Sequence, residues 1–587
     1  MKKIINAPEN VVSEMCNGIV LAHPELEFLH KYKIIKKKLI NNKKVTLISG
    51  GGSGHEPAHA GFVGKGMLDA AVCGDVFASP SQIQVYQAIK ATASENGTLL
   101  IIKNYSGDMM NFKNAAYLAS EDGIKVDYVK VDDDIAVEDS LYTVGRRGVA
   151  GTVLVHKIAG AAAEKGLELQ EVKRLAQKAV SNVRSIGFAL TSCTVPAKGT
   201  PTFELGPDEI EYGVGIHGEP GRRREKISTA DELAERMVTG LLKELKIEDG
   251  GAPKTVLLIN GFGGSPLQEL YLLNNSVNKI LDQKGITVVR AFVGNYMTSI
   301  DMAGASVSIM KLDDELEELL SEHCDAPAFK VSGPIEYINY GEKVLKQADS
   351  LKLHIVSEND ISASNVENDK LTLENLIFIV KKMGEIIVKN EVHFCELDSY
   401  AGDGDFGMSV AKGFKQLESE WHEIIGKSGN MGCFLEACSI VIMEYCGGAS
   451  GPIWGSAFRA AGRKIGAKKE ASVADVAEML QAAVKGIQAT GERSFGRGAV
   501  VGDKTLMDAL IPCADEWSKC AEKEKSFKEA FINGAQAAVD GAEKTKHIIA
   551  RMGRAGTVGE RSLGYPDAGA HALGIIFREL CESLIWL

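Results

Sequence analysis

The chain has 587 residues, a length that predicts about two to four domains. Its 66 basic and 78 acidic residues leave a formal net charge of −12, which argues against nucleic acid or an anionic membrane surface as the main partner. The 11 cysteines include no C-x-x-C pair, and no apolar run approaches the ~18 residues of a membrane span, so we expect a reduced, cytoplasmic protein without a secretory signal.

Short apolar runs alternate with amphipathic segments through the first half of the chain. The runs at 45–48, 99–102, 126–131, 255–259 and 288–293 have the length and composition of buried strands. Between them, segments such as 230–246 carry apolar residues at helical spacing. This alternation predicts parallel or mixed sheets covered by helices, which is an α/β fold.

The first of these runs leads directly into a cluster of glycines. Residues 49–61 read SGGGSGHEPAHAG, and bare backbone at the end of a strand is where ligands bind in open α/β sheets. The cluster lacks the Gly-Lys-Ser/Thr of a phosphate loop and the G-x-G-x-x-G of a dinucleotide site. We therefore expect a ligand that is smaller or less charged than a nucleotide, close to His55 and His59.

Three further residues of this half could take part in chemistry. Lys103 and Asp108 follow the second apolar run, where a lysine could polarise an oxygen and an aspartate could take a proton from a hydroxyl. A simple turn residue is the alternative for Asp108. His217 lies in GVGIHGEPGRRR, where the glycines on both sides leave its ring approachable, although an isolated histidine is more often a core or surface residue. The loops at 260–266 and 294–304 are expected to shape the same region.

The second half of the chain has a helical pattern. Residues 326–370 include Pro327 and Pro334 and a polar stretch, which favours an interdomain linker between domains at 6–325 and 371–587. After the linker, helical spacing dominates at the four segments 371–389, 473–487, 527–546 and 570–584, and Ser472 with Asp475 has the spacing of a capping box. We predict an all-α bundle with its ligand site at the loop end.

Three aspartates lie close together in the loop after the first of these helices. Asp398, Asp403 and Asp405 would repel one another unless a cation lay among them, and oxygen ligands alone suit Mg²⁺ or Ca²⁺. Their spacing does not fit an EF-hand, and a solvated acidic turn is the alternative. The neighbouring glycines leave room for phosphate oxygens beside a metal, which favours a magnesium site.

Two later glycine-rich loops could bind phosphate. The loop at 447–455 offers main-chain N–H groups and the hydroxyl of Ser450, and the loop at 553–570 offers the guanidinium groups of Arg554 and Arg561. Each loop alone could equally be a structural turn. Together with the aspartates, they favour a site for a magnesium-bound nucleotide.

From about residue 6 to its end, the chain closely resembles the single-chain, ATP-dependent dihydroxyacetone kinases. The resemblance is carried by separate segments in the family's order, which read GGGSGHEPAHAGFVGKGMLDAAVCGDVFASPS, GIHGEPG, LDSYAGDGD, GGASGPIWG, GDKTLMDAL and GRAGTVGERS. It implies an α/β half made of two subdomains with mixed sheets, followed by an all-α helical bundle or barrel. It also implies a kinase that uses ATP and Mg²⁺ to phosphorylate the terminal hydroxyl of dihydroxyacetone (glycerone) or glyceraldehyde.

The resemblance also assigns roles to residues. It implies that His217 forms a covalent hemiaminal with the substrate carbonyl, a bond that glycerol cannot make, and that His55 and Asp108 are the acid–base pair. The implied substrate-binding residues are Gly52, Ser53, Gly54, His55, Lys103 and Asp108, and the implied metal ligands are Asp398, Asp403 and Asp405. The implied nucleotide contacts are Phe406, Gly407, Met408, Ser409, Ala449, Ser450, Met507, Arg554, Asp567, Ala568 and Gly569.

Several alternatives stay open. Phe406, Tyr565 and Ala568 depart from the family pattern, which affects nucleotide affinity more than reaction class. The substrate could be a four-carbon ketose such as erythrulose. The chain could instead be a phosphoprotein-dependent phosphotransferase, an FAD-AMP lyase that forms cyclic FMN, or a non-catalytic sugar-binding protein. The resemblance favours a homodimer, with domains exchanged between subunits as one arrangement.

Overall fold

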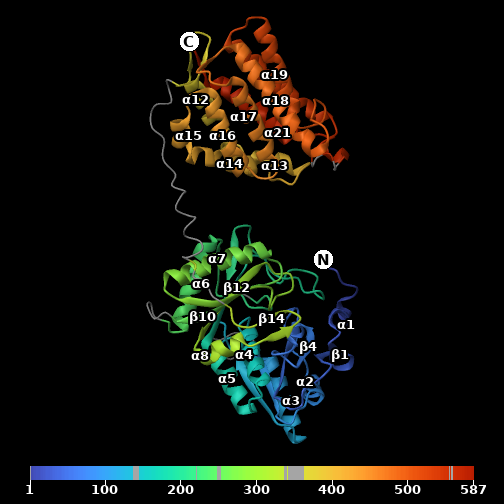
Figure 1. Ribbon diagram of the computed structural model, residues 1–587. Coiled ribbons are helices and arrows are strands. Elements are labelled where there is room, and N and C mark those ends of the chain that lie inside the picture. The colour runs from blue at the N-terminus through green and yellow to red at the C-terminus, as the bar shows by residue number, and fades with distance from the viewer. Residues whose placement is uncertain are drawn as a thin grey trace. The chain divides into compact units, whose positions relative to one another are not determined.

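The computed structural model describes residues 2–136, 145–219, 221–247, 253–335, 340, 363–553, 556 and 559–587. It divides into two compact units, Met1–Ala348 and Asp349–Leu587. Strands and helices alternate in the first unit, whereas helices build almost all of the second (Figure 1). Of the predicted linker at 326–370, residues 336–339 and 341–362 lie outside the described residues, and its bounds stay a prediction.

The N-terminal unit contains two six-stranded mixed sheets. The first has the order β1-β2-β4-β3-β5-β6, with β4, β3, β5 and β6 parallel. The second has the order β11-β10-β12-β7-β8-β9, in which β10 and β11 are parallel and the other neighbours antiparallel. The strands are β1 (Leu26–Leu29), β2 (Ile34–Lys37), β3 (Thr46–Ser53), β4 (Ala70–Val76), β5 (Thr98–Lys103), β6 (Val126–Val131), β7 (Val183–Ala189), β8 (Glu209–Tyr212), β9 (Arg223–Lys226), β10 (Lys254–Gly261), β11 (Thr287–Gly294) and β12 (Gly304–Leu312), with a hairpin of β13 (Cys324–Ala326) and β14 (Phe329–Val331). The predicted α/β fold with mixed sheets is confirmed.

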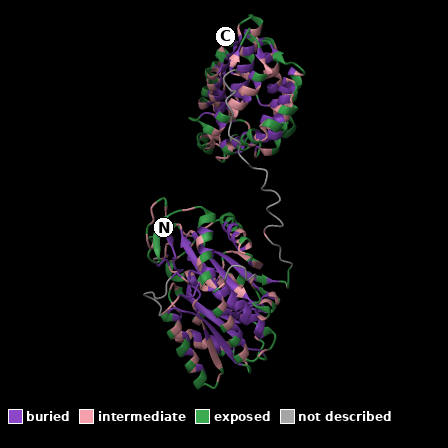
Figure 2. Ribbon diagram, turned by 90° about the vertical axis from the view of Figure 1, so that its left-hand side faces the viewer, coloured by how far each residue is buried: buried purple, intermediate pink, exposed green. Residues whose placement is uncertain are grey.

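Helices pack on these sheets in layers. Helices α2 and α3 cover one face of the first sheet, α6 and α7 cover one face of the second, and α4 and α5 lie between the two sheets (Figure 1). Their bounds are α1 (Val11–Ala22), α2 (Gln82–Ala91), α3 (Ser106–Glu121), α4 (Thr152–Glu164), α5 (Leu169–Asn182), α6 (Ala230–Glu244), α7 (Leu267–Gln283) and α8 (Asp314–Ser321). Because α4 has protein on all sides, its residues from Thr152 to Ala163 are all buried. Figure 2 shows the central strands as buried segments, whereas the edge strands β6, β9 and β11 are partly exposed.

The C-terminal unit is helical, as predicted. Its helices are α12 (Leu373–Lys389), α13 (Glu391–Ser399), α14 (Phe406–Ser419), α15 (Trp421–Lys427), α16 (Met431–Tyr445), α17 (Ser450–Ile465), α18 (Val473–Phe495), α19 (Met507–Glu522), α20 (Phe527–Lys544) and α21 (Ala568–Ser583). Two-residue strands pair β15 (Asn365–Val366) with β18 (Ile585–Trp586) and β16 (Leu371–Thr372) with β17 (Glu470–Ala471). The predicted capping box at Ser472 and Asp475 is present at the start of α18.

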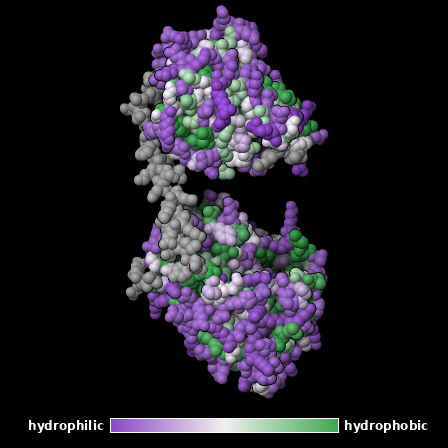
Figure 3. All heavy atoms as spheres, in the orientation of Figure 1, coloured by the Kyte–Doolittle hydropathy of each residue, from purple (hydrophilic) through white to green (hydrophobic). Residues whose placement is uncertain are grey.

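The surface of both units is mainly polar. The faces drawn in Figure 3 are largely hydrophilic, and their apolar residues lie in small separate groups. The larger exposed apolar side chains include Leu267, Tyr271 and Leu272 at the start of α7. Within the described part of the chain, no helix has both the length and the apolar character that a bilayer crossing requires.

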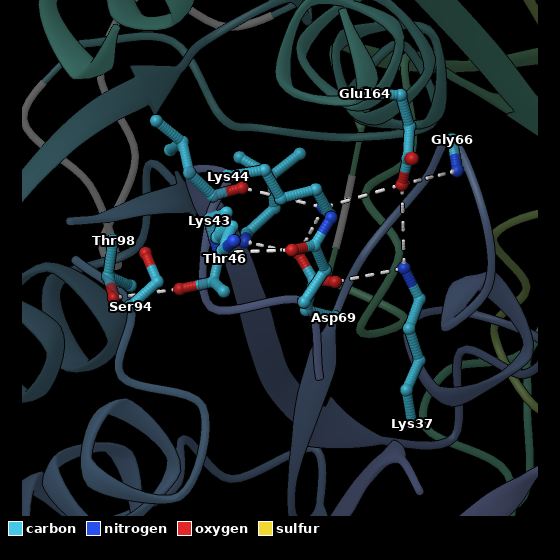
Figure 4. A network of polar contacts seen from close by, with 12 residues as sticks. Lys37, Lys43, Lys44, Thr46, Gly66, Asp69, Ser94, Thr98 and Glu164 are labelled. Carbon is cyan, nitrogen blue, oxygen red and sulfur yellow. Dashed lines mark hydrogen bonds and ion pairs between the residues drawn. The ribbon is translucent and has the colours of Figure 1, made fainter. Parts of the chain in front are cut away.

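A buried ion-pair cluster joins the starts of β3 and β4. The carboxylate of Asp69 accepts hydrogen bonds from Lys37 Nζ at 2.9 Å and Lys44 Nζ at 3.0 Å, and from the main-chain N–H of Leu47 at 2.9 Å (Figure 4). Glu164 at the end of α4 faces both lysines, at 3.9 and 3.4 Å. Burial alone would raise the pKa of Asp69, but the two ammonium groups outweigh it, so that its pKa is lowered.

Replacing Asp69 by asparagine should destabilise the N-terminal unit selectively. The substitution removes the nearest carboxylate of the buried Lys44 and the partly buried Lys37 and leaves them only Glu164, which is farther away. Breaking a buried ion pair costs about 3–5 kcal/mol of the free energy of unfolding. All four tryptophans, at 421, 454, 517 and 586, lie in the C-terminal unit, so their fluorescence reports the unfolding of that unit alone. In urea, the circular dichroism transition of the N-terminal unit should move to lower denaturant while the tryptophan transition stays in place.

Asp127 offers a matched control, because it pairs with Lys173 near the surface, where an ion pair contributes about 0–1 kcal/mol. If Asp69→Asn lowered the free energy of unfolding by no more than Asp127→Asn does, the stabilising role of the Asp69 cluster would be contradicted. The pKa of Asp69 is lower in the folded protein than in the unfolded chain. The ionised carboxylate therefore stabilises the fold fully at a pH above the ordinary aspartate pKa, and this stabilisation is lost as the pH falls through the lowered pKa.

Candidate active site

The glycine cluster forms the end of β3, beside the end of the parallel strand β5. A Cβ atom at Gly51 would lie 3.1 Å from Lys103 Nζ and 3.5 Å from Asp108 Oδ2, so that the bare backbone faces both groups. A Cβ atom at Gly52 would lie 2.7 Å from the main-chain nitrogen of Ala78, and one at Gly54, where φ is +103°, would lie 2.8 Å from the ring of Phe77. The space beside Gly52 and Gly54 is therefore filled by the turn after β4. This differs from the prediction from the sequence that a ligand contacts the bare backbone there. Ser53 donates its hydroxyl to the carbonyl of Gly74.

His55 is held in one orientation at the centre of this site. Its Nδ1 lies 2.8 Å from the carbonyl oxygen of Thr298, in the loop between β11 and β12. A carbonyl can only accept, so Nδ1 carries the hydrogen and Nε2 of the neutral ring has a free lone pair. Burial, with the nearby charges of Lys103 and His217, lowers the pKa of His55 well below its ordinary value, so the ring is neutral near neutral pH.

His217 meets His55 although the two residues lie far apart in the sequence. Their Nε2 atoms are 3.1 Å apart, and the rings are nearly perpendicular at 4.6 Å between centroids. The rings of Tyr105 and Phe77 also contact His217 edge-on, at 4.7 and 5.3 Å. His217 lies in the loop between β8 and β9, and its side chain is 22% exposed, so it can be reached from solvent.

Lys103 and Asp108 form the polar wall of the same site. Lys103 is the last residue of β5, and Asp108 lies in the first turn of α3. Both side chains are buried, and neither Lys103 Nζ nor Asp108 Oδ1 has a hydrogen-bond partner among the described residues. Burial lowers the pKa of Lys103 and raises that of Asp108, while the attraction between their charges opposes both shifts. Buried polar atoms of this kind call for a ligand with complementary oxygens.

A second histidine pair lies behind this wall. His59 Nδ1 is 3.0 Å from His156 Nε2, and their other ring nitrogens have no hydrogen-bond partner within the described chain. Burial, followed by the charge of Lys103, lowers the pKa of His156 to about 3. Both rings are therefore neutral donors and acceptors, without a charge of their own.

The three predicted metal ligands come together in the C-terminal unit. Asp398 lies in the last turn of α13, and Asp405 directly precedes α14. One carboxylate oxygen from each of Asp398, Asp403 and Asp405 lies within 4.8 Å of the other two. Asp398 Oδ2 accepts the main-chain N–H of Gly404 at 2.9 Å. A Cβ atom at Gly402 would lie 2.4 Å from Asp398 Oδ1, so a larger residue there would displace this carboxylate from its position. An oxygen-only donor set in a tight loop suits a hard divalent cation.

A cleft of about 200 Å³ extends from these aspartates. Its lining includes the predicted nucleotide residues Phe406, Ala449, Ser450, Asp567, Ala568 and Gly569. Gly407, Met408, Ser409 and Met507 lie outside that lining; Met507 is fully buried, whereas Met408 is largely exposed. Arg554 lies outside the described residues.

Lys504 also lines the cleft, and it was not predicted as a site residue. Its Nζ donates hydrogen bonds to the carbonyls of Ser562, Tyr565 at 2.9 Å and Ile548 at 3.3 Å. The lysine therefore fixes the loop that carries Asp567. The GDKTLMDAL segment was a signal for this region, but only the fold shows that its lysine binds the last loop.

Two other features of the cleft follow from the same loop. Asp567 caps α21 by accepting the N–H of Ala570 at 2.8 Å; burial, and then the nearby charges of Asp508 and Asp398, raise its pKa to about 7. The rings of Tyr400 and Tyr565 stack at 3.7 Å between centroids, which joins the aspartate loop to the last loop.

Family models match both halves of the chain. Residues 17–328 match the Dak1 domain and residues 400–582 match the DAK2 domain. Over 318 residues, 54% of this chain and 95% of the relative, the chain is 54% identical to the dihydroxyacetone-binding subunit DhaK of PTS-dependent dihydroxyacetone kinase 1 from Listeria innocua.

Other relatives align over the full length. The chain is 33% identical to the triokinase/FMN cyclase of Rattus norvegicus, over 99% of both chains, and 34% identical to the L-erythrulose kinase of Pectobacterium atrosepticum, over 98% of this chain and 95% of that one. The crystal structure of the dihydroxyacetone kinase from C. freundii in complex with AMP-PNP and Mg²⁺ matches with a TM-score of 0.58 and 31% identity, covering 99% of each chain.

Proposed function

Because this chain belongs to the dihydroxyacetone kinase family and combines a Dak1 and a DAK2 domain, we propose that it transfers a phosphoryl group from ATP to the terminal hydroxyl of dihydroxyacetone or a related short carbonyl sugar. The observation that carries the proposal is the meeting of His55 and His217 beside Lys103 and Asp108. Two imidazole rings and two buried side chains that each have an unpartnered polar atom suit a small molecule with a carbonyl and two hydroxyls.

In this proposal, His217 holds the substrate and the other groups prepare its hydroxyl. Nε2 of His217 adds to the carbonyl carbon, which fixes a small substrate in one orientation and converts later steps into intramolecular ones. Asp108, whose raised pKa makes it a better base than an ordinary aspartate, accepts the proton of the terminal hydroxyl. Lys103 neutralises the negative charge that develops nearby. Substrate binding by Gly52, Ser53 and Gly54 is carried forward from the sequence as part of this proposal, with only the main chain available, because the Cα positions of the two glycines face the turn after β4 and the Ser53 hydroxyl donates to Gly74.

The nucleotide is proposed to bind in the cleft of the C-terminal unit. Asp398, Asp403 and Asp405 fit Mg²⁺ through their oxygen-only donor set, and the metal would neutralise the phosphate oxygens during transfer. The N-terminus of α17, with Ala449 and Ser450, lines this cleft, and the positive end of the helix dipole there favours phosphate; the N–H of Ser450 itself donates to the carbonyl of Gly447. The other predicted contacts, from Phe406 to Ser409 and at Met507, Arg554, Asp567, Ala568 and Gly569, are carried forward as part of this proposal.

An assay across carbonyl sugars tests the substrate. With ATP and Mg²⁺, we expect phosphorylation of dihydroxyacetone and glyceraldehyde, and no phosphorylation of glycerol, which has no carbonyl for His217. The full-length similarity to an L-erythrulose kinase makes erythrulose the second candidate. If erythrulose reacted rapidly while dihydroxyacetone stayed unchanged, the named three-carbon substrate would be wrong and the mechanism would stand.

The same assay separates the other candidates. Over 318 residues the chain is 54% identical to a subunit of a PTS-dependent kinase, which favours testing phosphoprotein dependence. Multiple turnovers with ATP alone would exclude it. The triokinase relative is also named an FMN cyclase, so FAD and Mn²⁺ should be supplied and cyclic FMN sought as a second product.

We also propose a homodimer in which domains of the two subunits cooperate. Phosphoryl transfer requires the two sites to meet, within one chain or between two. Co-assembly of His217→Ala chains with Asp403→Ala chains would restore activity if transfer occurs between subunits, and would leave both inactive if each chain works alone.

A further inference from the structure

Glu219 lies two residues after His217, and its carboxylate turns back toward that histidine. Oε2 accepts the main-chain N–H of His217 at 2.8 Å. Oε1 lies 3.9 Å from His217 Nδ1, which is longer than a hydrogen bond but within ion-pair distance. Glu219 is only 8% exposed, so little water screens its charge from the imidazole ring.

Arg147 prevents this carboxylate from moving away. The guanidinium group is 1% exposed and donates from NH1 to Glu219 Oε1 at 3.3 Å. It is itself fixed by bonds to Asp134 Oδ2 at 2.8 Å and to the carbonyl of Gly213 at 2.9 Å. A Cβ atom at Gly215 would lie 1.9 Å from Glu219 Oε1 and 2.5 Å from Arg147 NH1, so this contact requires glycine at position 215.

Glu219 and Arg147 are both charged, because each is buried beside a partner of opposite charge. Burial alone would raise the pKa of Glu219, but His217 and Arg147 outweigh it, and the pKa falls to about 2. Glu219 is therefore ionised near neutral pH. The neighbouring carboxylates raise the pKa of Arg147, which stays charged as well.

The proton positions around His217 follow from its two neighbours. His55 already uses its Nδ1–H for the carbonyl of Thr298, so the hydrogen between the two Nε2 atoms comes from His217. If Nε2 carried the only proton of that ring, its Nδ1 lone pair would face the carboxylate of Glu219. A proton on both nitrogens satisfies His55 on one side and Glu219 on the other.

We propose that Glu219, held by Arg147, is a positioning residue that keeps a proton on Nδ1 of His217 and thereby directs Nε2 to the substrate carbonyl. The inference rests on the proposed function, in which His217 is the nucleophile. This role gives a reason for the buried charged pair of Glu219 and Arg147 next to the ring of His217.

The covalent step balances with these groups alone. His217 passes its Nε2 proton to Nε2 of His55, and the freed lone pair forms the C–N bond. The π electron pair of the carbonyl moves onto its oxygen, and that oxygen takes the proton from Nε2 of His55. The lowered pKa of His55 makes its protonated ring a stronger acid than an ordinary histidine. The ring of His217 carries one positive charge before and after the step, on the side that faces Glu219, so the carboxylate stabilises both states.

Glu219→Gln tests this role because it removes the charge and keeps the size of the side chain. Ring-nitrogen NMR of isotope-labelled histidine should show His217 without its Nδ1 proton at neutral pH. The affinity for the covalent adduct, followed by NMR of dihydroxyacetone labelled at its carbonyl carbon, should fall by about 10- to 100-fold, as for other groups that orient a histidine. Unchanged Nδ1 protonation together with unchanged adduct affinity would overturn the proposal.

Glu211→Gln is the matched control. Glu211 is also buried and holds the same loop, by accepting the N–H of Gly221 at 2.9 Å, so its substitution perturbs the loop without removing the charge beside His217. Its NMR spectrum and adduct affinity should match the wild type. Equal losses in the two variants would mean that the loop, and not the charge, matters, which also overturns the proposal.

A conservative variant guards against a folding defect. Glu219→Asp keeps the charge, and should retain the Nδ1 proton with an adduct affinity between those of the wild type and Glu219→Gln; loss of that proton in a folded Glu219→Asp variant would count against the role. The ring-nitrogen measurement is made without substrate. If the wild type forms no adduct at His217, the proposed function fails, while the effect of Glu219 on the ring is still decided.

Discussion

His217→Ala should abolish the covalent adduct and reduce kcat/KM by at least about 10³-fold, which corresponds to ~4 kcal/mol of transition-state stabilisation. In the proposed mechanism the substrate has too few atoms to be held by hydrogen bonds alone, so the covalent bond to Nε2 would provide most of its orientation. His55 cannot substitute for it, because its ring is fixed by the carbonyl of Thr298 and faces His217 rather than solvent.

The adduct should be followed by NMR of the labelled carbonyl carbon, and turnover by product formation from ATP. His23→Ala is the control, since His23 lies after α1 at the surface of the same unit and should leave both measurements unchanged. An adduct that persists in the His217→Ala protein would refute the assignment of the nucleophile.

Asp403→Asn should reduce turnover by more than about 100-fold at ordinary Mg²⁺ concentrations, and raise the Mg²⁺ concentration needed for half-maximal activity. The three carboxylates lie within 4.8 Å of one another, so the loss of one removes a ligand and a third of the charge that attracts the cation. The adduct at His217 should form normally, because the N-terminal unit supplies every group of that site.

Stability separates the loss of a ligand from a loss of fold in this variant. Without Mg²⁺, three neighbouring carboxylates repel one another, so Asp403→Asn should be at least as stable as the wild type when tryptophan fluorescence reports unfolding of the C-terminal unit. Asp540→Asn, at the exposed side of α20, is the control and should change neither activity nor Mg²⁺ dependence. Full activity of Asp403→Asn at low Mg²⁺ would contradict the proposed metal site.

Much of the fold and the outline of both sites could be predicted because their signals are local. Apolar runs at 45–48 and 99–102 become β3 and β5, and the rule that ligands bind at the ends of parallel strands placed the glycine cluster and Lys103 at one edge. The three aspartates lie within one loop, so their proximity followed from sequence spacing.

The groups that control these sites could not be predicted in the same way. Arg147 reaches Glu219 across the fold, and the carbonyl that orients His55 belongs to Thr298, in the other sheet's loops. Neither contact leaves a periodic pattern, because each is a single long-range bond. Lys504 is similar, since a lysine that binds three main-chain carbonyls has the same local sequence as one that binds phosphate.

The unpartnered groups of the sugar site have a consequence for how this protein can evolve. A buried polar atom without a hydrogen bond costs about 1–3 kcal/mol of stability, and Lys103 Nζ and Asp108 Oδ1 both lack a partner among the described residues. Apolar replacements of these two residues would relieve that cost, so selection for thermal stability alone would first remove two of the proposed catalytic groups. A ligand that supplies the missing bonds acts as a folding stabiliser by mass action, which makes the protein most durable where its substrate is abundant.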